Sequence, residues 1–238
     1  MILDTFKPAQ VVVQIDYAPA LELWDSAGRV NRRVQKIWPD AQVVPDQVSP
    51  ANVTLRSPKA QIDTGVTRST IALSRLTTID HVSTQQVVDT FAAWRSELAL
   101  TKLNRVSTRV IYIREFPALR SANEALLAFG LCRWPKSKVF DQPEESDHNS
   151  FDLVYRFEDE ASFSFLRVRT EQIKLELKVE SDIGTLKEAS DIKNRLIIDF
   201  DRGLKQSIDA ASFRMDEWLK GFVHVLRRDV EKVLKESP

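Results

Sequence analysis

NVTLRSPKAQIDTGVTRSTIALSRLT, residues 52–77, carries the pattern from which the class of fold follows. The turn-forming residues Pro58 and Gly65 divide it into short runs rich in β-branched and apolar side chains, which is typical of consecutive strands. Connections this short join antiparallel neighbours, so the stretch predicts an antiparallel meander. The predicted strands are 52–57, 60–64 and 69–77, preceded by a further run over 42–44.

The segments around the meander alternate between the periodicities of strands and of helices. Apolar residues alternate over 11–17 and recur at helical spacing over 23–37, and Pro39 ends that helix. Ser83 begins a second predicted helix with a capping box. A β-branched strand is then predicted over 109–116.

The second half of the chain repeats this order loosely. Ser121 and Glu124 form a capping box that predicts a short helix. Asp209 is expected to cap a long amphipathic final helix. Strands are predicted over 151–158, 161–170, 172–180 and 195–201.

Antiparallel strands segregated from helices indicate the α+β class rather than a parallel doubly wound sheet. We predict two related halves, each an antiparallel strand meander flanked by helices, with a long C-terminal helix. The halves are residues 1–118 and 119–238, which either fold separately or form one integrated domain.

The composition limits the classes of function. The 34 Lys and Arg residues balance 34 Asp and Glu residues, so no net positive charge favours general nucleic-acid binding. Cys132 is the only cysteine, which excludes an internal disulfide and a thiolate zinc cage. No run approaches the length of a membrane span, and residues 1–7 lack the pattern of a signal peptide. We therefore expect a cytoplasmic protein that does not enter a membrane.

Charge is nevertheless unevenly distributed along the chain. Residues 141–160 carry eight acidic side chains against one arginine, whereas residues 91–120 carry six basic side chains against two acidic ones. Such runs are either solvated faces or docking surfaces, and an acidic docking surface would favour a basic partner protein.

Aromatic residues supply further binding candidates. Trp24, Trp94 and Trp218 fall within helical runs and are expected in the core. Trp38 and Trp134 each precede a proline at a helix end, where a tryptophan is either a lid on the core or an interface anchor. The complete set of binding candidates is Trp38, Trp134, Glu144, Glu145, Asp147, Arg109 and Arg114.

Two carboxylate patterns are candidates for metal binding. Asp152 on one strand with Glu176 and Lys178 on a later one resembles the Asp…Glu-x-Lys arrangement of metal-dependent nucleases, in which the lysine steadies the attacking water or the phosphate. The same alternation is also typical of a half-exposed antiparallel strand. Asp199 and Asp201 share one strand face, where they would either chelate Mg²⁺ or form salt bridges.

A third class of function is a small-molecule or nucleotide sensor. In this hypothesis the strands enclose a pocket that contains Arg109, Tyr112 and Arg114.

Several segments together resemble a sporadically distributed family of uncharacterised bacterial proteins. They are the opening strand, the helix that ends in Trp38-Pro39, the strand over 105–113, and Leu196-Ile-Ile-Asp-Phe-Asp201 before a long helix. Because patchy distribution is typical of mobile or defence genes, the resemblance implies an antitoxin, immunity or phage-defence accessory role.

From these patterns we expect a protein-binding module that is not an enzyme and uses no cofactor. Its partner is expected to be another protein, and a homo-oligomer is compatible with the sequence. The metal-dependent nuclease and the small-molecule sensor remain the alternatives.

Overall fold

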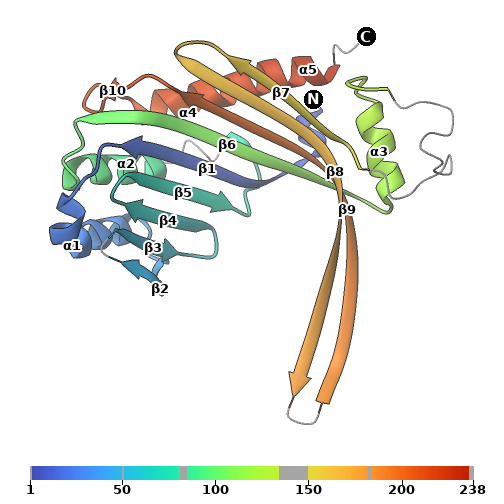
Figure 1. Cartoon of the computed structure of the whole chain (residues 1–238), viewed down its shortest axis with the longest axis horizontal. Coiled ribbons are helices and arrows are strands. Elements are labelled where there is room, and N and C mark those ends of the chain that lie inside the picture. The colour runs from blue at the N-terminus through green and yellow to red at the C-terminus, as the bar shows by residue number, and fades with distance from the viewer. Residues whose placement is uncertain (1, 50, 81–84, 134–149, 182–183, 236–238) are drawn as a thin grey trace.

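The computed structural model describes residues 2–49, 51–80, 85–133, 150–181 and 184–235, with side chains described outside 176–190. These residues form one antiparallel sheet of ten strands together with the helices (Figure 1). The α+β prediction is therefore confirmed. In chain order the elements are η1 Leu3–Thr5, β1 Lys7–Tyr17, α1 Glu22–Ile37, β2 Gln42–Ser49, β3 Asn52–Arg56, β4 Ala60–Gly65, β5 Arg68–Ser74, α2 Gln85–Glu97, β6 Lys102–Phe116, α3 Leu119–Leu127, β7 Asp152–Glu158, β8 Ser162–Ser181, β9 Gly184–Leu204, β10 Ile208–Asp209, α4 Met215–Val225, the π-helical turn η3 Leu226–Val230, and α5 Glu231–Lys235.

The strand order is β2-β3-β4-β5-β1-β6-β9-β8-β7, with β10 paired to β6. The predicted meander is present as β2 to β5 and forms one side of the sheet. In the middle, β6 pairs with β9 over 106–116 and 194–204. The sheet therefore continues across the boundary expected near residue 118, and the described strands of both halves belong to one sheet. A kinship between the halves stays a prediction.

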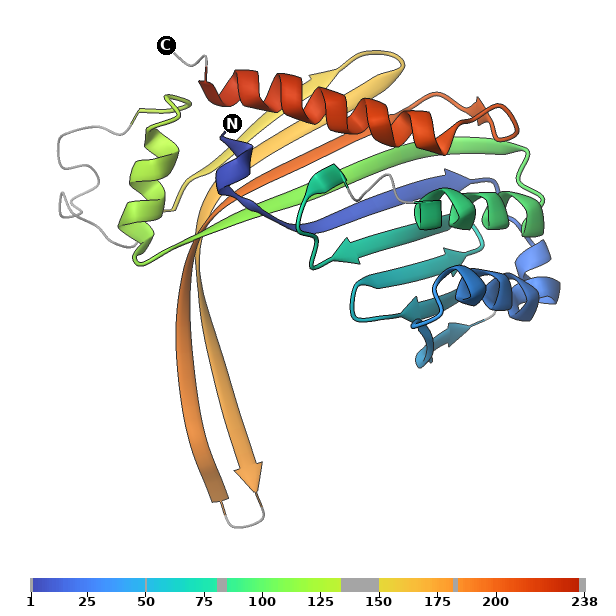
Figure 2. The same cartoon turned by 180° about the vertical axis from the view of Figure 1, so that it is seen from behind.

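The helices cover one face of the sheet, which we call the helical face (Figure 2). Strand alternation supplies its apolar surface: Val11, Val13 and Ile15 of β1 are fully buried there. The residues between them point to the other side, which we call the open face. Figure 1 looks onto the open face and Figure 2 onto the helical face.

The structure corrects three expectations about single elements. The strands predicted over 161–170 and 172–180 are one continuous strand, β8, because no turn residue separates them. Asp209 does not cap the final helix, which begins at Met215; its carboxylate instead accepts the N–H of Ser212 at 2.9 Å in the preceding turn. Ser121 lies inside α3, which starts at Leu119 directly after the extended residue Ala118.

Strands β8 and β9 extend far beyond their neighbours. The last residue of β6 pairs with Asn194, and the first residue of β7 pairs with Arg169. Residues 173–181 and 184–193 therefore pair only with each other among the described strands, and we call this ribbon the β-arm. At about 3.3 Å per residue, the β-arm is roughly 27 Å long. Figure 1 shows that it projects away from the rest of the sheet.

A buried carboxylate ties the N-terminal segment to the last helix. Glu231, only 5% exposed, accepts the backbone N–H groups of Leu3 at 2.7 Å and Ile2 at 3.0 Å. Lys235 lies 3.2 Å from the same carboxylate. Burial acts to raise the pKa of Glu231, but the two N–H donors and Lys235 outweigh it, and the pKa is lowered.

We expect Glu231→Ala to lower the free energy of unfolding by about 1–3 kcal/mol, because it leaves two backbone donors without their acceptor. Glu217→Ala, at an exposed position of the same helix, is the matched control and should change it by less than about 0.5 kcal/mol. Urea denaturation of parent and variants at neutral pH measures both values.

The pH dependence provides a second readout of the same contact. A carboxyl with a lowered pKa contributes stability above its ordinary pKa and loses it as the pH falls through the lowered value. The difference between parent and Glu231→Ala should therefore shrink in acid. A difference that stays constant down to about pH 2 would contradict the assignment.

Candidate functional site

The open face carries a row of side chains whose charges alternate in sign from strand to strand. Direct cross-strand partners are Asp16 with Arg68 and with Arg105, and on the other side of β6 Arg109 with Asp201. Opposite charges at facing positions attract, so the row favours this register of the strands over others that would place like charges opposite each other. We call it the charge ladder. From β5 to β7 its members are Arg68, Asp16, Arg105, Asp201, Arg109, Asp199, Arg167 and Asp152.

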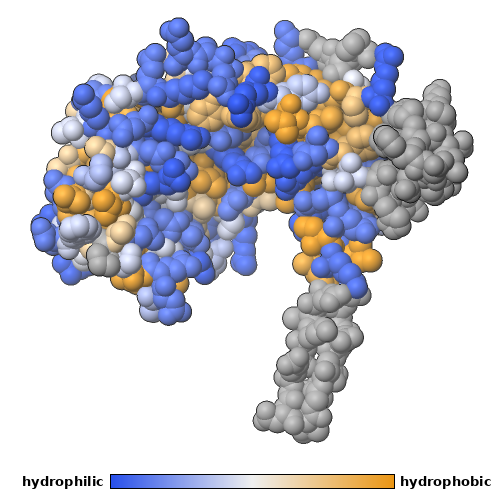
Figure 3. Space-filling model, in the orientation of Figure 1, coloured by the Kyte–Doolittle hydropathy of each residue, from blue (hydrophilic) through white to orange (hydrophobic). Residues whose placement is uncertain are grey.

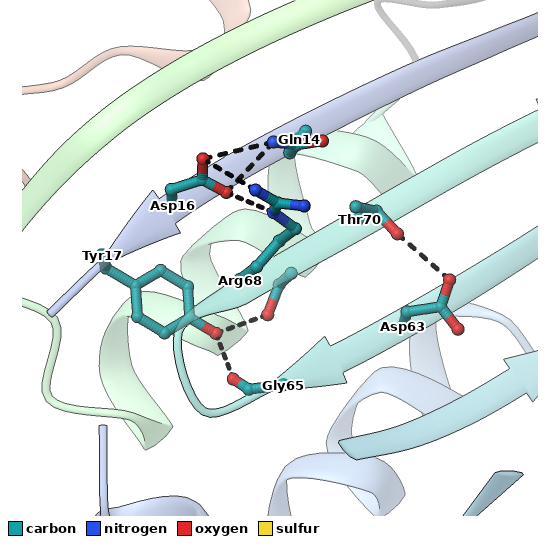
Figure 4. A network of polar contacts seen from close by, with 8 residues as sticks. Gln14, Asp16, Tyr17, Asp63, Gly65, Arg68 and Thr70 are labelled. Atoms are coloured by element: carbon teal, nitrogen blue, oxygen red, sulfur yellow. Dashed lines mark hydrogen bonds and ion pairs between the residues drawn. The ribbon is translucent and has the colours of Figure 1, made fainter. Parts of the chain in front are cut away.

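Near Arg68 and Asp16, the alternation of side chains along β1 places two polar networks on opposite sides of the sheet (Figure 4). On the open face, Nε of Arg68 lies 2.7 Å from Oδ1 of Asp16, which also accepts the amide of Gln14 at 3.1 Å. The next residue, Tyr17, points into the core, where its hydroxyl donates to the carbonyl of Gly65 at 2.5 Å. Burial raises the pKa of Tyr17 to about 12, so the phenol stays protonated at neutral pH.

The centre of the ladder is a two-pronged ion pair. Nε of Arg109 lies 2.7 Å from Oδ1 of Asp199, and its Nη2 lies 2.5 Å from Oδ2. The side chain of Asp199 is only 8% exposed, so both oxygens are occupied by the guanidinium and shielded from solvent. The hydrogen bond to Asp199 raises the pKa of Arg109.

Asp201, two residues along the same strand, is held differently. Its Oδ1 is buried and has no hydrogen-bond partner among the described residues. Burial raises its pKa, which the charges of Arg105 and Arg109 only partly offset. The alternative that Asp199 and Asp201 chelate Mg²⁺ is not supported by this geometry, because one carboxylate is already paired and the other faces two cations. Across the parts of the chain that are described, no group of three or more His, Cys, Asp or Glu side chains could hold a metal ion.

The residues of the nuclease alternative are separated along β8. Asp152 on β7 pairs with Arg169 of β8, and Glu176 lies seven positions after Arg169 on β8. At about 3.3 Å per residue this separation is roughly 23 Å, whereas two carboxylates must both approach within about 2–2.6 Å of a shared cation. Asp152 is instead bonded to Arg167. The register therefore does not bring the two carboxylates together, because their spacing in the sequence does not become proximity in the sheet.

Two phenylalanines stand on the open face beside the ladder. Phe163 and Phe165 have ring centroids 5.8 Å apart, with Arg105 over one ring and Arg156 over the other. Gly203, opposite Phe163, makes room for its ring, because an added Cβ would lie 2.4 Å from a ring carbon. This pair was not among the predicted site residues, although the alternation in SFSFLRVR (162–169) places both rings on one face together with Arg167 and Arg169.

The tryptophan and acidic binding candidates have different outcomes. Trp38 is only 7% exposed and donates its indole N–H to Thr90 at 2.8 Å, so it is a lid on the core. The prediction that Trp24 lies in the core is wrong, because this side chain is 60% exposed on α1. Trp94 is buried, as expected. The candidates that lie outside the described residues are Trp134, Glu144, Glu145 and Asp147.

Described residues of the two charged segments are largely engaged within the chain. Glu158 lies 2.8 Å from Lys205, and Asp159 accepts backbone N–H groups in the turn before β8. In the basic segment, Arg105 and Arg109 face carboxylates of the charge ladder. A docking surface for a basic partner would therefore have to rest on other members of 141–160.

The three residues of the sensor hypothesis are not in one pocket. Arg109 lies on the open face, whereas Tyr112 is buried under the helices, where burial raises its pKa to about 12. Arg114 lines a separate cavity at the end of β6, with Lys7, Arg75 and Arg195.

No protein-family model matches the chain, and no curated protein matches its sequence. Within the described ranges, the helices are all too short or too polar to cross a membrane.

Asp152 and Asp201 are expected to respond oppositely to the same isosteric change. Arg167 lowers the pKa of Asp152, so Asp152→Asn should lower the free energy of unfolding at pH 7 by about 0.2–1 kcal/mol, as for exposed ion pairs. Asp201 carries a raised pKa, and its charge is a net cost above that pKa. Asp201→Asn should therefore raise the free energy of unfolding at pH 7, by at most about 1 kcal/mol.

Both differences should vanish in acid, where the parent carboxyls are protonated as well: the Asp201 difference is lost first, as the pH falls through its raised pKa, and the Asp152 difference last, below the ordinary carboxyl pKa. Urea titrations of the parent and the two variants between about pH 2 and pH 7 test this pair. Destabilisation by Asp201→Asn at pH 7 would mean that the attraction of Arg105 and Arg109 outweighs burial.

Proposed function

We propose that this chain is a non-catalytic protein-binding module that engages its partner through the β-arm. The observation that carries the proposal is the extent of β8 and β9 beyond the sheet. Over 173–181 and 184–193 each strand has one neighbour among the described residues, which leaves a row of backbone N–H and C=O groups on both edges. Unpaired edges of this kind are templates for a strand of another chain.

The energetics of a two-stranded ribbon support the same conclusion. An isolated hairpin buries little apolar surface and is at best marginally stable in water. The β-arm also exposes large apolar side chains near the sheet: Leu175 is 47% exposed on one face and Ile192 is 54% exposed on the other. Figure 3 shows apolar residues gathered at this base of the arm, below a predominantly polar open face. A bound partner would cover them and supply the missing edges.

The non-catalytic character is supported by the placement of the candidate catalytic residues, since Asp152 on β7 pairs with Arg169 and Glu176 lies seven positions further along β8. The finer role, as an antitoxin, immunity or phage-defence accessory protein, rests on the resemblance stated for the sequence. In each of these roles a protein acts by occupying a surface of another protein, which is what an arm can do.

Charge placed on the apolar base of the arm should weaken partner binding. The test variant is Leu175→Glu/Ile192→Glu, and the matched control is Leu21→Glu/Trp24→Glu, which changes two comparably exposed apolar residues beside and on α1, far along the sheet. Affinity capture from the native host identifies the partner, and titration of the purified pair then gives the affinity. We expect the control to bind as the parent does and the arm variant to bind at least about tenfold more weakly.

Sedimentation of the purified chain distinguishes the kinds of partner. A parent multimer that the arm variant converts to a monomer identifies the partner as a second copy of this chain. Equal affinity of parent and arm variant for a captured partner would refute the role of the β-arm, provided that circular dichroism shows both proteins folded.

A further inference from the structure

A basic pocket lies where β1 begins, β6 ends and β9 enters the sheet from the β-arm (Figure 1). Its volume is about 530 Å³, within the range of small-molecule sites. Four of its lining side chains are cationic, namely Lys7, Arg75, Arg114 and Arg195. One lining carboxylate, Glu115, opposes them.

The charges in this pocket are only partly neutralised within the chain. Glu115 lies 3.4 Å from Arg195 and 3.5 Å from the neighbouring Lys193, so it is shared between two cations. Lys7 and Arg75 have no ion-pair partner among the residues that the structure describes. This is unlike the charge ladder, whose cations face carboxylates. Like charges gathered in a concave surface raise the local potential, which favours a multiply charged anion.

Arg75 adds a backbone observation. Its φ of 56° lies in the left-handed region, which is unfavourable for a non-glycine residue and favours glycine. The position directly after β5 holds an arginine nonetheless, and its side chain lines the pocket. Strained backbone conformations cluster at ligand-binding sites, so the φ of Arg75 is consistent with a role of its side chain in this pocket.

Arg195 supplies an unsatisfied donor at the same place. Its Nε is buried and has no acceptor among the described residues, although its other nitrogens contact carboxylates. A guanidinium presents several donors in a fixed fork that matches the oxygens of a phosphate. Arg114 is held in place by the ring of Phe116, 5.0 Å away, and so does not need an anion to be ordered.

The geometry points to a binding site for a small molecule that carries a diphosphate group. The four cations face Glu115 in the lining and, through Arg195, Glu171 beside it, which leaves a net charge of about +2 that a diphosphate balances and a single carboxylate does not. Pro8, Leu76 and Ile113 supply apolar surface for an organic part. Nucleoside diphosphates have both features. This inference is independent of the β-arm and of protein binding.

Isothermal titration calorimetry of the intact chain tests the site with pyrophosphate and the four common nucleoside diphosphates, with adenosine as the uncharged probe. We expect pyrophosphate and at least one nucleoside diphosphate to bind, adenosine not to bind, and the affinity to fall as salt is added. If none of the phosphate probes gives a binding signal at about 1 mM, the proposal is overturned. Binding of a single-stranded oligonucleotide without binding of pyrophosphate would also overturn it.

Two variants assign the binding to this pocket. Arg75→Gly removes the guanidinium and relieves the left-handed strain, so it should raise the urea midpoint while it weakens binding about tenfold or more. Arg114→Ala should weaken binding similarly. Arg56→Ala, an exposed arginine on β3, is the control and should bind as the parent does. Unchanged affinity in Arg75→Gly and Arg114→Ala would place any phosphate elsewhere and overturn the assignment.

Discussion

The antiparallel pairing of β6 with β9 is the contact on which the rest of the structure depends. It joins the meander on one side to the β7–β8 strands on the other, and it sets the register over 106–116 and 194–204. In this register Val110 faces Phe200 under the helices, and Arg109 faces Asp201 on the open face. A slip by one residue would bring apolar and charged residues to opposite faces, so the core and the charge ladder are fixed by the same pairing.

On the open face, positive and negative side chains balance one another locally, as they do over the whole chain. Six adjacent strands contribute alternating charges to the ladder, and in its central pair the carboxylate of Asp199 is shielded from solvent beneath the half-exposed Arg109. These charges attract one another across neighbouring strands, so little net positive potential remains to attract a polyanion such as nucleic acid. The basic pocket is the local exception, and it lies at the edge of the ladder beside the base of the β-arm.

The two proposed binding features share one position in the fold. Asn194 pairs with the last residue of β6, and the residues before it belong to the β-arm. Arg195, the next residue, lines the basic pocket. The end of β6 is therefore the place where the sheet stops, the arm begins and a cavity forms. The first two have one cause, since β8 and β9 are longer than the strands beside them.

The sequence by itself determined the element types, because periodicity is local: the meander, α1 up to Pro39 and the amphipathic final helix all follow from it. The sequence also predicted which side chains share one face of a strand, as for Asp199 and Asp201. Only the tertiary structure decided which strands are neighbours, that Asp152 meets Arg167 rather than Glu176, and that Trp38 is buried while Trp24 is exposed. The physical reason is that strand pairing and helix docking join residues far apart in the chain, and no local pattern encodes their register.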